Sequence, residues 1–422
     1  MPRGFYLLIA GQALSALADN ALLIVAIALL QERGSPLWWA PLLKFAFTLS
    51  YVVLAPGIGP LADAMPKARL MTAMNLVKFA GVALLMADVN PLLAFAVVGF
   101  GAASYAPAKY GLVTELVGPR QLVAANGWIE VSVVCAALLG TVLGGLLVAY
   151  ALRDSAASRA LRQWLAPVDD SSLLLSMAML MAAYLLSAAM NAGVPDSGAR
   201  SAPSRIHPAA LLREFREANR ALWRDRDGGL SLAVTSIFWG VGATLQFAVL
   251  KWASELLGLT LERAAYLQAA VAVGVIAGAG LAGRHVMLRR AKGVLPAGVL
   301  LGLCMPLVAS TTSLWLAVPL LTLVGAMGGA LVVPLNALLQ HRGYVLLSAG
   351  RSIAVQGFNE NLSVLMMLAG YATLVALDVP IVPLMWAFGF VVAAAIAVLA
   401  WREHGLERRL GPSVDSQRTT LR

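Results

Sequence analysis

Residues 59–69 read Gly59-Pro-Leu-Ala-Asp63-Ala-Met-Pro-Lys67-Ala-Arg69 and overlap the end of an apolar run over 37–62. A glycine, a carboxylate and two basic side chains therefore stand at fixed spacing where a hydrophobic helix is expected to end. A carboxylate at such a point can bind basic side chains and the N-terminus of a neighbouring helix. The stretch thus predicts a charged cluster that joins helices at one membrane surface.

The composition identifies the surroundings of these helices. Of 422 residues, 60% are hydrophobic and only 12% are charged, whereas soluble domains carry roughly 25% charged residues. So few charges cannot cover a globule of this size, and lipid must contact much of its exterior. The residues show no disulfide framework and no metal-ligand spacing, and we expect neither a metal nor another cofactor.

Apolar runs long enough to cross a bilayer, which takes roughly 20 residues, recur along the chain. We expect helices near 5–30, 37–62, 70–88, 91–115, 122–150, 171–193, 230–257, 263–283, 294–312, 314–340, 346–376 and 380–401. The fold class predicted is an all-α membrane protein with about 12 transmembrane helices.

The basic residues set the orientation of these helices. The net charge is +10, and most Lys and Arg residues fall at the N-terminus, in alternate short loops and in the C-terminal tail. The positive-inside rule places these segments, and with them both termini, in the cytoplasm. Because the basic residues follow topology, nucleic-acid binding is not expected.

A long polar segment over 194–229 divides the chain. It begins with Pro, Gly and Ser and continues as a basic amphipathic stretch. We expect six-helix bundles over 1–193 and 230–403, a cytoplasmic linker between them and a cytoplasmic tail over 404–422, the layout of a two-lobed transporter. Residues 151–170 are expected to form an extracellular loop without a motif.

Residue patterns repeat between the predicted halves. Asn126-Gly-Trp-Ile-Glu130 in the first half matches Gln356-Gly-Phe-Asn-Glu360 in the second, with amide, glycine, aromatic ring and carboxylate at the same spacing. Pro107-Ala-Lys109 likewise matches Pro334-Leu-Asn336. Together these matches predict two pseudo-symmetric bundles.

Charges at membrane depth are the candidate site residues, because a charge in lipid costs roughly 2.5–3.5 kcal/mol on insertion scales. They are Asp19, Lys44, Lys78, Lys109, Glu130, Lys251 and Glu360. Asp19, followed by Asn20, is interpreted as lining a cavity and contacting substrate; the alternative is a structural pair with a lysine. Lys109, between a proline and a glycine, is interpreted in the same way. The mixed signs predict a nearly neutral polar cavity.

The other polar residues leave two interpretations open. Glu130 and Glu360 suit function and a structural role between helices equally. Lys78 and Lys251 lie near helix ends, where they can reach the membrane surface. Amides such as Asn336 and Gln356 favour helix–helix hydrogen bonds over ligand contact. Small-residue packing seams are expected at Gly140, Gly144, Gly145, Gly274, Gly278 and Gly280.

The 59–69 stretch resembles the G-x-x-x-D-x-x-x-[RK]-x-[RK] signature of the major facilitator superfamily. The resemblance implies a conformational latch made by Gly59, Asp63, Lys67 and Arg69. A degenerate counterpart without the aspartate lies in the second half, over 283–292.

Six strings resemble the bacterial lysophospholipid transporter (LplT) family: SALADNALL (15–23), APAKYG (106–111), VAANGWIE (123–130), SIFWGVGATL (236–245), VVPLNALLQ (332–340) and AVQGFNEN (354–361). The resemblance implies a flippase that moves lysophospholipids, chiefly lysophosphatidylethanolamine, from the outer to the inner leaflet of the bacterial inner membrane. It also implies functional coupling to an acyltransferase/acyl-carrier-protein synthetase that restores the second acyl chain.

The resemblance also implies substrate roles for an acid in the first helix and a lysine in the fourth, at the positions of Asp19 and Lys109. The family usually carries an arginine where this chain has Gln246. Lys251 is offset from it by about 140° on an ideal helix and is an imperfect substitute.

Two other functions, drug efflux and acyl transfer, are disfavoured by the residues of the chain. Proton-coupled efflux of amphipathic drugs is disfavoured, because the fifth-helix glycine motif lacks the proline usual in such antiporters. A membrane acyltransferase is disfavoured because no histidine has an aspartate at the His-x4-Asp spacing. The sequence therefore predicts a transporter rather than an enzyme.

Overall fold

The computed structural model describes residues 3–34, 39–149, 152, 154–165, 171–195, 198, 208–259 and 261–410. The chain forms two compact units. Unit 1 comprises Met1–Val117, Cys135–Ala218 and Leu347–Phe358. Unit 2 comprises Gly118–Val134, Asn219–Leu346 and Asn359–Arg422. Each unit thus contains a segment from the other half of the sequence, and the division at 194–229 into two bundles stays a prediction.

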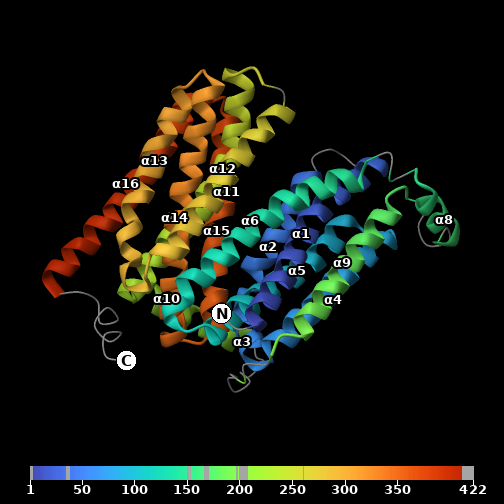
Figure 1. Cartoon of the computed structure of the whole chain (residues 1–422), viewed down its shortest axis with the longest axis horizontal. Helices are drawn as coiled ribbons and strands as arrows, with labels where there is room; N and C mark the ends of the chain where they lie inside the picture. The colour runs from blue at the N-terminus through green and yellow to red at the C-terminus, as the bar shows by residue number, and fades with distance from the viewer. Residues whose placement is uncertain are drawn as a thin grey trace. The chain divides into compact units, whose positions relative to one another are not determined.

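The helices are drawn in Figure 1. Those of unit 1 are α1 (Arg3–Glu32), α2 (Trp39–Val53), α3 (Ala55–Ala64), α4 (Lys67–Met86), α5 (Pro91–Leu116), α8 (Ala156–Leu165) and α9 (Leu174–Ala192). Those of unit 2 are α11 (Arg226–Leu256), α12 (Leu261–His285), the 3-10 segment η2 (Leu288–Val294), α13 (Leu295–Ser310), α14 (Leu314–Leu346) and α16 (Ile381–Leu410). Both units contribute to α6 (Leu122–Leu147), α10 (Pro208–Arg224) and α15 (Ala349–Ala376).

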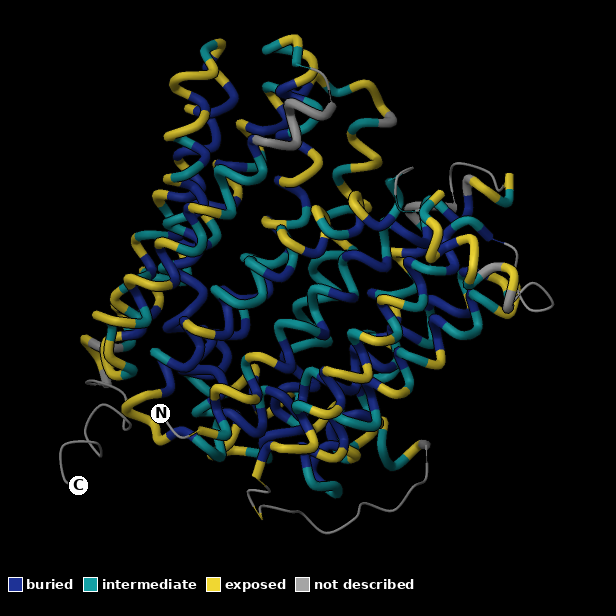
Figure 2. The backbone as a smooth tube through the Cα atoms, turned by 45° about the vertical axis from the view of Figure 1, so that its right-hand side comes forward, coloured by how far each residue is buried: buried dark blue, intermediate teal, exposed yellow. Residues whose placement is uncertain are grey.

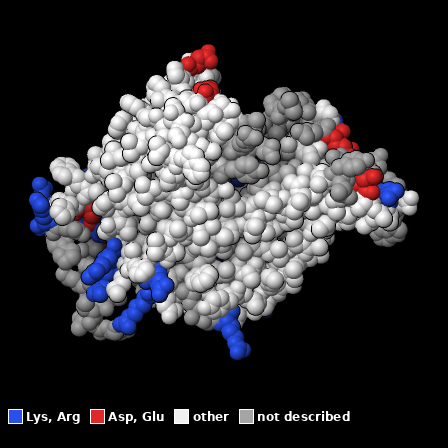
Figure 3. Space-filling model, turned by 45° about the horizontal axis from the view of Figure 1, so that its top comes forward, with Lys and Arg blue, Asp and Glu red and all other residues white. Residues whose placement is uncertain are grey.

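The helices confirm the predicted all-α membrane architecture. Among the described residues, ten helices are long and apolar enough to cross a membrane, or eleven if α2 and α3 count as one bent span. Helix α15 is not among them; it contains Arg351 and the run Asn359-Glu360-Asn361. The predicted number of about twelve is therefore not confirmed by the described residues. On the face drawn in Figure 3, charged atoms are few, as a lipid-facing surface requires.

The apolar run over 37–62 is broken at Leu54 rather than continuous. Its two parts, Leu42–Val53 and Ala55–Ala64, are bent by 64°. Pro56 lies in the first turn of α3, where its missing N–H and its ring interrupt the preceding helical hydrogen bonds. The bend directs α3, which carries Gly59 and Asp63, away from the axis of α2.

Other boundaries also differ from the expectations. Helix α14 continues to Leu346, so the loop expected after 340 is helical. The expected loop over 151–170 contains the amphipathic helix α8. Helix α16 extends to Leu410, into the expected tail over 404–422, of which 411–422 lie outside the described residues. Polar residues can extend a helix beyond the bilayer, so hydropathy alone places these ends poorly.

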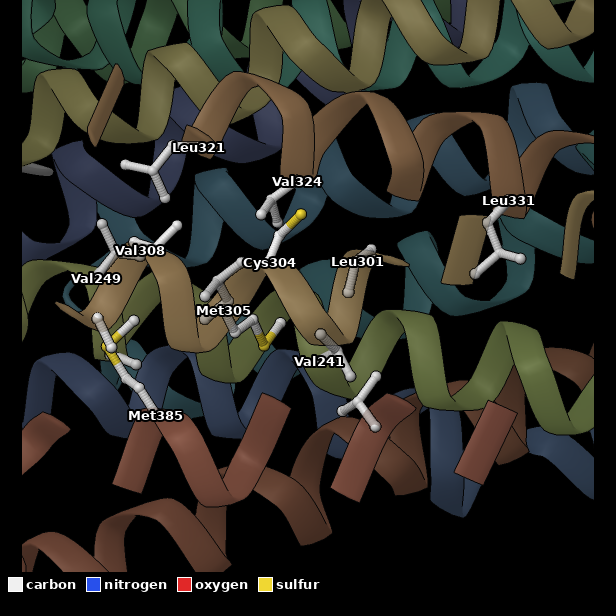
Figure 4. Close-up of a cluster of buried hydrophobic side chains, with 14 of the residues drawn as sticks. Val241, Val249, Leu301, Cys304, Met305, Val308, Leu321, Val324, Leu331 and Met385 are labelled. Atoms are coloured by element: carbon white, nitrogen blue, oxygen red, sulfur yellow. The ribbon is translucent and has the colours of Figure 1, made fainter. Parts of the chain in front are cut away.

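Each unit has its own apolar core. Along the helices buried and exposed residues alternate, so a helix turns one side into its unit (Figure 2). In unit 2, Leu301, Cys304, Met305 and Val308 of α13 lie among side chains of α11, α14 and α16 (Figure 4). Lipid is as apolar as these side chains, so close packing rather than exclusion of water holds such a core together.

Glycines allow helices α12 and α14 to lie in backbone contact. A Cβ added at Gly274 would overlap the carbonyl oxygen of Thr322, and one at Gly278 would overlap that of Ala326. In unit 1, Gly140 of α6 similarly faces Leu17 of α1, where an added Cβ would lie 2.6 Å from the carbonyl oxygen. The packing seams predicted at these glycines are present. Gly145 and Gly280 are exceptions, because a Cβ at either would meet nothing within 4 Å.

We predict that Gly278→Ala lowers the melting temperature of the detergent-purified protein, because α12 must move away from α14. Overpacking of this kind costs about 1–3 kcal/mol. Gly280→Ala is the matched control on the same helix and should leave the melting temperature unchanged. Equal melting temperatures for the two variants would contradict this account of the seam.

Candidate functional site

A buried ion pair joins α1 and α4 inside unit 1. The Lys78 ammonium lies 2.7 Å from Oδ2 of Asp19. The hydroxyl of Tyr184 on α9 donates to Oδ1 of the same carboxylate over 2.8 Å. The Lys78 side chain is 2% exposed and that of Asp19 is 16% exposed. Asp19 is thus turned into the unit and not toward lipid.

Further hydrogen bonds connect this pair to three helices. The Lys78 ammonium donates to the Ser15 hydroxyl over 2.9 Å, and that hydroxyl donates to Oδ1 of Asn75 over 2.7 Å. The Asn75 amide donates to Ser187 over 2.8 Å, whose hydroxyl donates to the Gly11 carbonyl over 2.7 Å. The network stabilises charges that hydrocarbon would otherwise exclude.

Aromatic rings complete the surroundings of the Lys78 ammonium. It lies 5.3 Å from the ring centroid of Tyr105 on α5 and 5.7 Å from that of Tyr184. Rings at this distance attract a cation through their quadrupole. Lys78 is therefore enclosed on several sides, whereas Asp19 keeps an exposed portion.

Lys109 forms a second polar centre on α5. Its ammonium lies 4.2 Å from the ring centroid of Tyr110 and 3.5 Å from Oε1 of Gln12. The Lys109 residue is 8% exposed. Gln12, Ser15 and Asp19 follow one another at the spacing of one helix face, so α1 presents one polar face to both lysines.

Asn20 does not join this network. Its side-chain amide donates to the Ala16 carbonyl of its own helix over 2.8 Å. A Cβ added at Gly140 of α6 would lie 2.8 Å from the Asn20 Cβ, so Asn20 is a packing residue of the α1–α6 seam here. Its predicted substrate contact stays untested.

The predicted latch residue Asp63 caps helix α15. Its Oδ1 accepts from the Gly350 amide over 2.8 Å and its Oδ2 from the Arg351 amide over 3.2 Å. The Ser348 hydroxyl donates to the same carboxylate. A carboxylate at a helix N-terminus satisfies unpaired amides and interacts favourably with the helix dipole. Asp63 thereby joins the first half of the sequence to the second.

Glycines bring α3 and α15 close enough for this cap. A Cβ at Gly59 would lie 2.9 Å from Cα of Arg351, and one at Gly350 would lie 2.6 Å from the Gly59 carbonyl oxygen. Lys67 instead forms a buried ion pair with Glu115 of α5 at 2.6 Å. Arg69 is exposed. The residues of the motif therefore make separate contacts and do not form one cluster.

Two polar contacts, one helical turn apart, join α6 to α14 in unit 2. The side-chain amides of Asn126 and Gln340 exchange hydrogen bonds of 3.0 and 2.9 Å. Asn336 donates to Oε1 of Glu130 over 3.2 Å. Both contacts again connect the first half of the sequence to the second.

The remaining predicted site residues lie in different surroundings. Gln246 is exposed, and its backbone carbonyl accepts from Gln268 over 2.9 Å. Lys251 pairs with Glu255 at 2.6 Å on the surface of α11. Gln356 is buried and Glu360 is half-buried on α15. Lys251 is thus engaged locally, and its predicted role in place of the family arginine stays untested.

A charge clamp fixes the start of α11 in unit 2. Lys292 lies 2.5 Å from Asp227 and 2.6 Å from Glu403, which also binds Arg226 at 2.8 Å. Arg342 of α14 pairs with Asp225 at 2.5 Å. Burial alone would raise the pKa of Asp225, but hydrogen bonds from Arg342 and the Gly228 amide outweigh burial and lower it. Asp225 therefore stays ionised at physiological pH.

The linker helix α10 packs against α15. In unit 1, Glu214 binds Arg351 at 3.0 Å, and the rings of Phe215 and Phe358 meet edge-to-face at 5.2 Å. In unit 2, Asn359 donates to Asn219 over 2.9 Å. The amphipathic stretch of the linker is therefore part of the folded protein.

The sequence left open a structural pair of Asp19 with a lysine, and the structure contains such a pair with Lys78; sequence reasoning did not name Lys78 as the partner and missed Tyr184 and the polar residues beyond it. Asn75 and Lys78 on α4, and Tyr184, Ser187 and Asn191 on α9, follow helical spacing. A polar stripe along one face of an apolar helix was the feature of the sequence that could have indicated these residues.

We predict that Asp63→Asn speeds amide exchange at the N-terminus of α15. The loss of the charged cap should cost about 1–2 kcal/mol of local opening free energy. Deuterium uptake of a peptide covering 347–358 should rise roughly five- to thirtyfold in rate. Asp88, which is 81% exposed and pairs with Arg33, supplies the control Asp88→Asn. Unchanged uptake in Asp63→Asn would show that the cap does not hold α15.

Comparison with known proteins identifies the family. The Major Facilitator Superfamily profile matches residues 8–346. The lysophospholipid transporter LplT of Yersinia enterocolitica is 39% identical over 383 residues, which cover 90% of each chain. The Yersinia pestis protein of that name is 38% identical, over 90% of this chain and 89% of the relative.

Solved structures show the same fold. A bacterial homologue of the iron transporter ferroportin, in an outward-facing state, superposes with a TM-score of 0.71 at 14% identity, over 96% of this chain and all of that one. The Escherichia coli fucose:proton symporter FucP also gives 0.71, at 16% identity, over 94% and 98% of the two chains. The resemblance seen in the sequence is thus confirmed, and the chain belongs to the major facilitator superfamily and, within it, to the family of LplT lysophospholipid transporters.

Proposed function

We propose that this protein transports lysophospholipids, chiefly lysophosphatidylethanolamine, from the outer to the inner leaflet of the bacterial inner membrane. The observation that carries the proposal is the identity of 38–39% to proteins named lysophospholipid transporters, over about nine-tenths of the chain. The buried charges of both signs in unit 1 suit a head group that itself carries both signs.

The head group would bind in unit 1 while the acyl chain stays in apolar surroundings. Lys109 would bind the phosphate, and the exposed part of Asp19 would face the ammonium. The Gln12 amide, beside Lys109, offers a hydrogen bond to the same phosphate or to the glycerol hydroxyl. Without such partners, moving an ionised group out of water costs many kcal/mol. Gln246, Lys251, Glu130, Glu360, Asn336 and Gln356 remain candidates for weaker contacts.

Transport would proceed by alternating access, in which two lobes rock about the head-group site. The Asp63 cap on α15 and the Asn126–Gln340 contact join the two halves of the sequence. Both would break and re-form in each cycle. In the latch proposed for Gly59, Asp63, Lys67 and Arg69, Gly59 and Asp63 would supply the contact with α15, while Lys67 stays paired with Glu115. The contacts of Asp63 and Asn126 are hydrogen bonds, so water could replace them at modest net cost.

Both termini and the linker would lie in the cytoplasm. An acyltransferase/acyl-carrier-protein synthetase acting there would restore the second acyl chain and draw lysophospholipid inward. Downhill movement driven by this reaction needs no coupling ion.

The test is reconstitution of the pure protein in liposomes. We expect acyl-labelled fluorescent lysophosphatidylethanolamine to become protected from an external quencher faster than in protein-free liposomes. Lys109→Gln should slow this at least about tenfold, because a charge-assisted hydrogen bond contributes roughly 1.5–3 kcal/mol. Repeating the measurement with and without a proton gradient reports whether transport is coupled.

Arg213→Gln is the matched control, because Arg213 is an exposed residue of α10 that meets only Glu217, at 4.0 Å, among the described contacts. It should retain the wild-type rate. No protection by the wild-type protein would overturn the proposed function. Wild-type rates in Lys109→Gln would overturn the assignment of the phosphate partner alone.

A further inference from the structure

We propose that Trp239 and Ser236 of α11 bind the ester group that joins the acyl chain of a lysophospholipid to its glycerol, and that they thereby select acyl lipids over alkyl lipids. The inference rests on the proposed transport of lysophospholipids and deepens it, because it concerns the linkage of the chain and not the head group. It predicts that an ether-linked lysophosphatidylethanolamine, which has the same head group but no carbonyl oxygen, binds more weakly than the ester.

Both side chains carry a hydrogen-bond donor that lacks an acceptor. The indole N–H of Trp239 and the hydroxyl of Ser236 are buried and have no hydrogen-bond partner among the residues that the structure describes. Thr244 of the same helix differs, because its hydroxyl donates to the Gly240 carbonyl over 2.9 Å. A buried donor left unpaired lowers the stability of the protein. The two donors therefore indicate an acceptor that comes from outside the chain.

Helix geometry places the two donors together on one side of α11. Ser236 and Trp239 are three residues apart, so their side chains are neighbours on the helix surface. Gln246 follows Trp239 by seven residues, which brings it to within about 20° of the same direction. Val241, labelled in Figure 4, and Leu245 lie in the apolar core of unit 2, and both point at least about 120° away from Trp239. The donors thus lie on the side of α11 that faces away from the core of its own unit.

This side of the helix is open next to the donors. Gly242, one turn beyond Trp239, is exposed, and a Cβ added there would meet nothing within 4 Å. Gln246, a further turn along, is also exposed. The half-buried ring of Trp239 meets Phe238 edge-to-face, with ring centroids 5.5 Å apart. Because the donor atoms are covered in this conformation, the indole has to turn toward the open space at Gly242 before its N–H reaches a ligand.

The chemistry of the donors identifies the group that they bind. The phosphate of the head group has a charged partner proposed in Lys109, and charge-assisted hydrogen bonds are the stronger ones for an ion. An indole combines a polar N–H with a large apolar body, which suits the point where the polar glycerol ends and the acyl chain begins. The ester carbonyl at that point has two lone pairs, one for each donor. An alkyl ether keeps the chain but lacks this oxygen, so its binding leaves both donors without the carbonyl.

The experiment compares ester-linked and ether-linked lysophosphatidylethanolamine of the same chain length. Affinities for the detergent-purified full chain come from the rise in melting temperature on titration with each lipid, and transport is measured in liposomes. The wild type should prefer the ester by at least about threefold, the effect of one neutral hydrogen bond. Trp239→Phe and Ser236→Ala should each reduce this preference by weakening binding of the ester while leaving binding of the ether unchanged.

Trp252→Phe is the matched control. The N–H of Trp252, also on α11, donates to the Ala309 carbonyl over 3.2 Å. This variant should lower the melting temperature of the lipid-free protein and leave the preference for the ester unchanged. Trp239→Phe removes a donor that is unpaired among the described residues, so it should lower that melting temperature less. If Trp239→Phe does not fold, Ser236→Ala provides the same comparison.

Equal affinities of the wild type for the two lipids would rule out the inference alone, and so would an equal loss of both affinities in Trp239→Phe and Ser236→Ala. A preference for the ester without transport of either lipid would contradict the proposed function, while the affinities would still decide the role of the two donors. A wild-type protein that neither binds nor transports either lipid would contradict the proposed function and the inference together.

Discussion

The free-energy cost of burying a charge among apolar helices constrains how this protein folds. Hydrocarbon offers no partner to an ion, so each buried charge persists only where other helices supply one. Lys78 and Asp19 meet this condition for each other, with hydroxyl, amide and aromatic neighbours from four helices. The same requirement limits how α1, α4 and α9 can rotate, since turning α1 or α4 would separate Asp19 from Lys78, and turning α9 would remove the hydrogen bond from Tyr184 to Asp19. Chemistry and helix packing are therefore specified by one set of residues.

Much of the fold could be predicted from sequence because bilayer thickness imposes a length on apolar runs. All of the predicted segments contain helix. The wrong helix boundaries lie at proline and at polar residues. Pro56 produces the bend at Leu54, which the hydropathy pattern did not indicate. Helix α14 continues past Gln340, and α8 forms where a loop was expected. Glycine content alone also could not separate Gly278, which touches a backbone, from Gly280, which does not.

The site was predictable in its residue types and not in its pairings. Asp19 and Lys109 were singled out because an ion inside an apolar run is costly anywhere in the bilayer. Which lysine meets Asp19 depends on how helices turn and how deep each residue lies, and Lys78 was interpreted as a residue reaching for the membrane surface. The Asp63 cap depends on the N-terminus of α15, far along the chain. The spacing of residues within a motif does not indicate partners that lie so far along the chain.

The two halves of the predicted repeat differ in how their matching ions are paired. Glu115 follows Pro107 at the same distance as Arg342 follows Pro334, so one position carries opposite charges. In the first half, Lys67 of α4 pairs with Glu115 of the neighbouring helix α5. In the second, Lys292 and Arg342 bind Asp227 and Asp225, which lie where the linker enters α11. The two predicted halves are consequently not interchangeable: in a tandem of two second halves, Arg342 of each copy would keep its acid only if that copy included the connecting chain that carries Asp225.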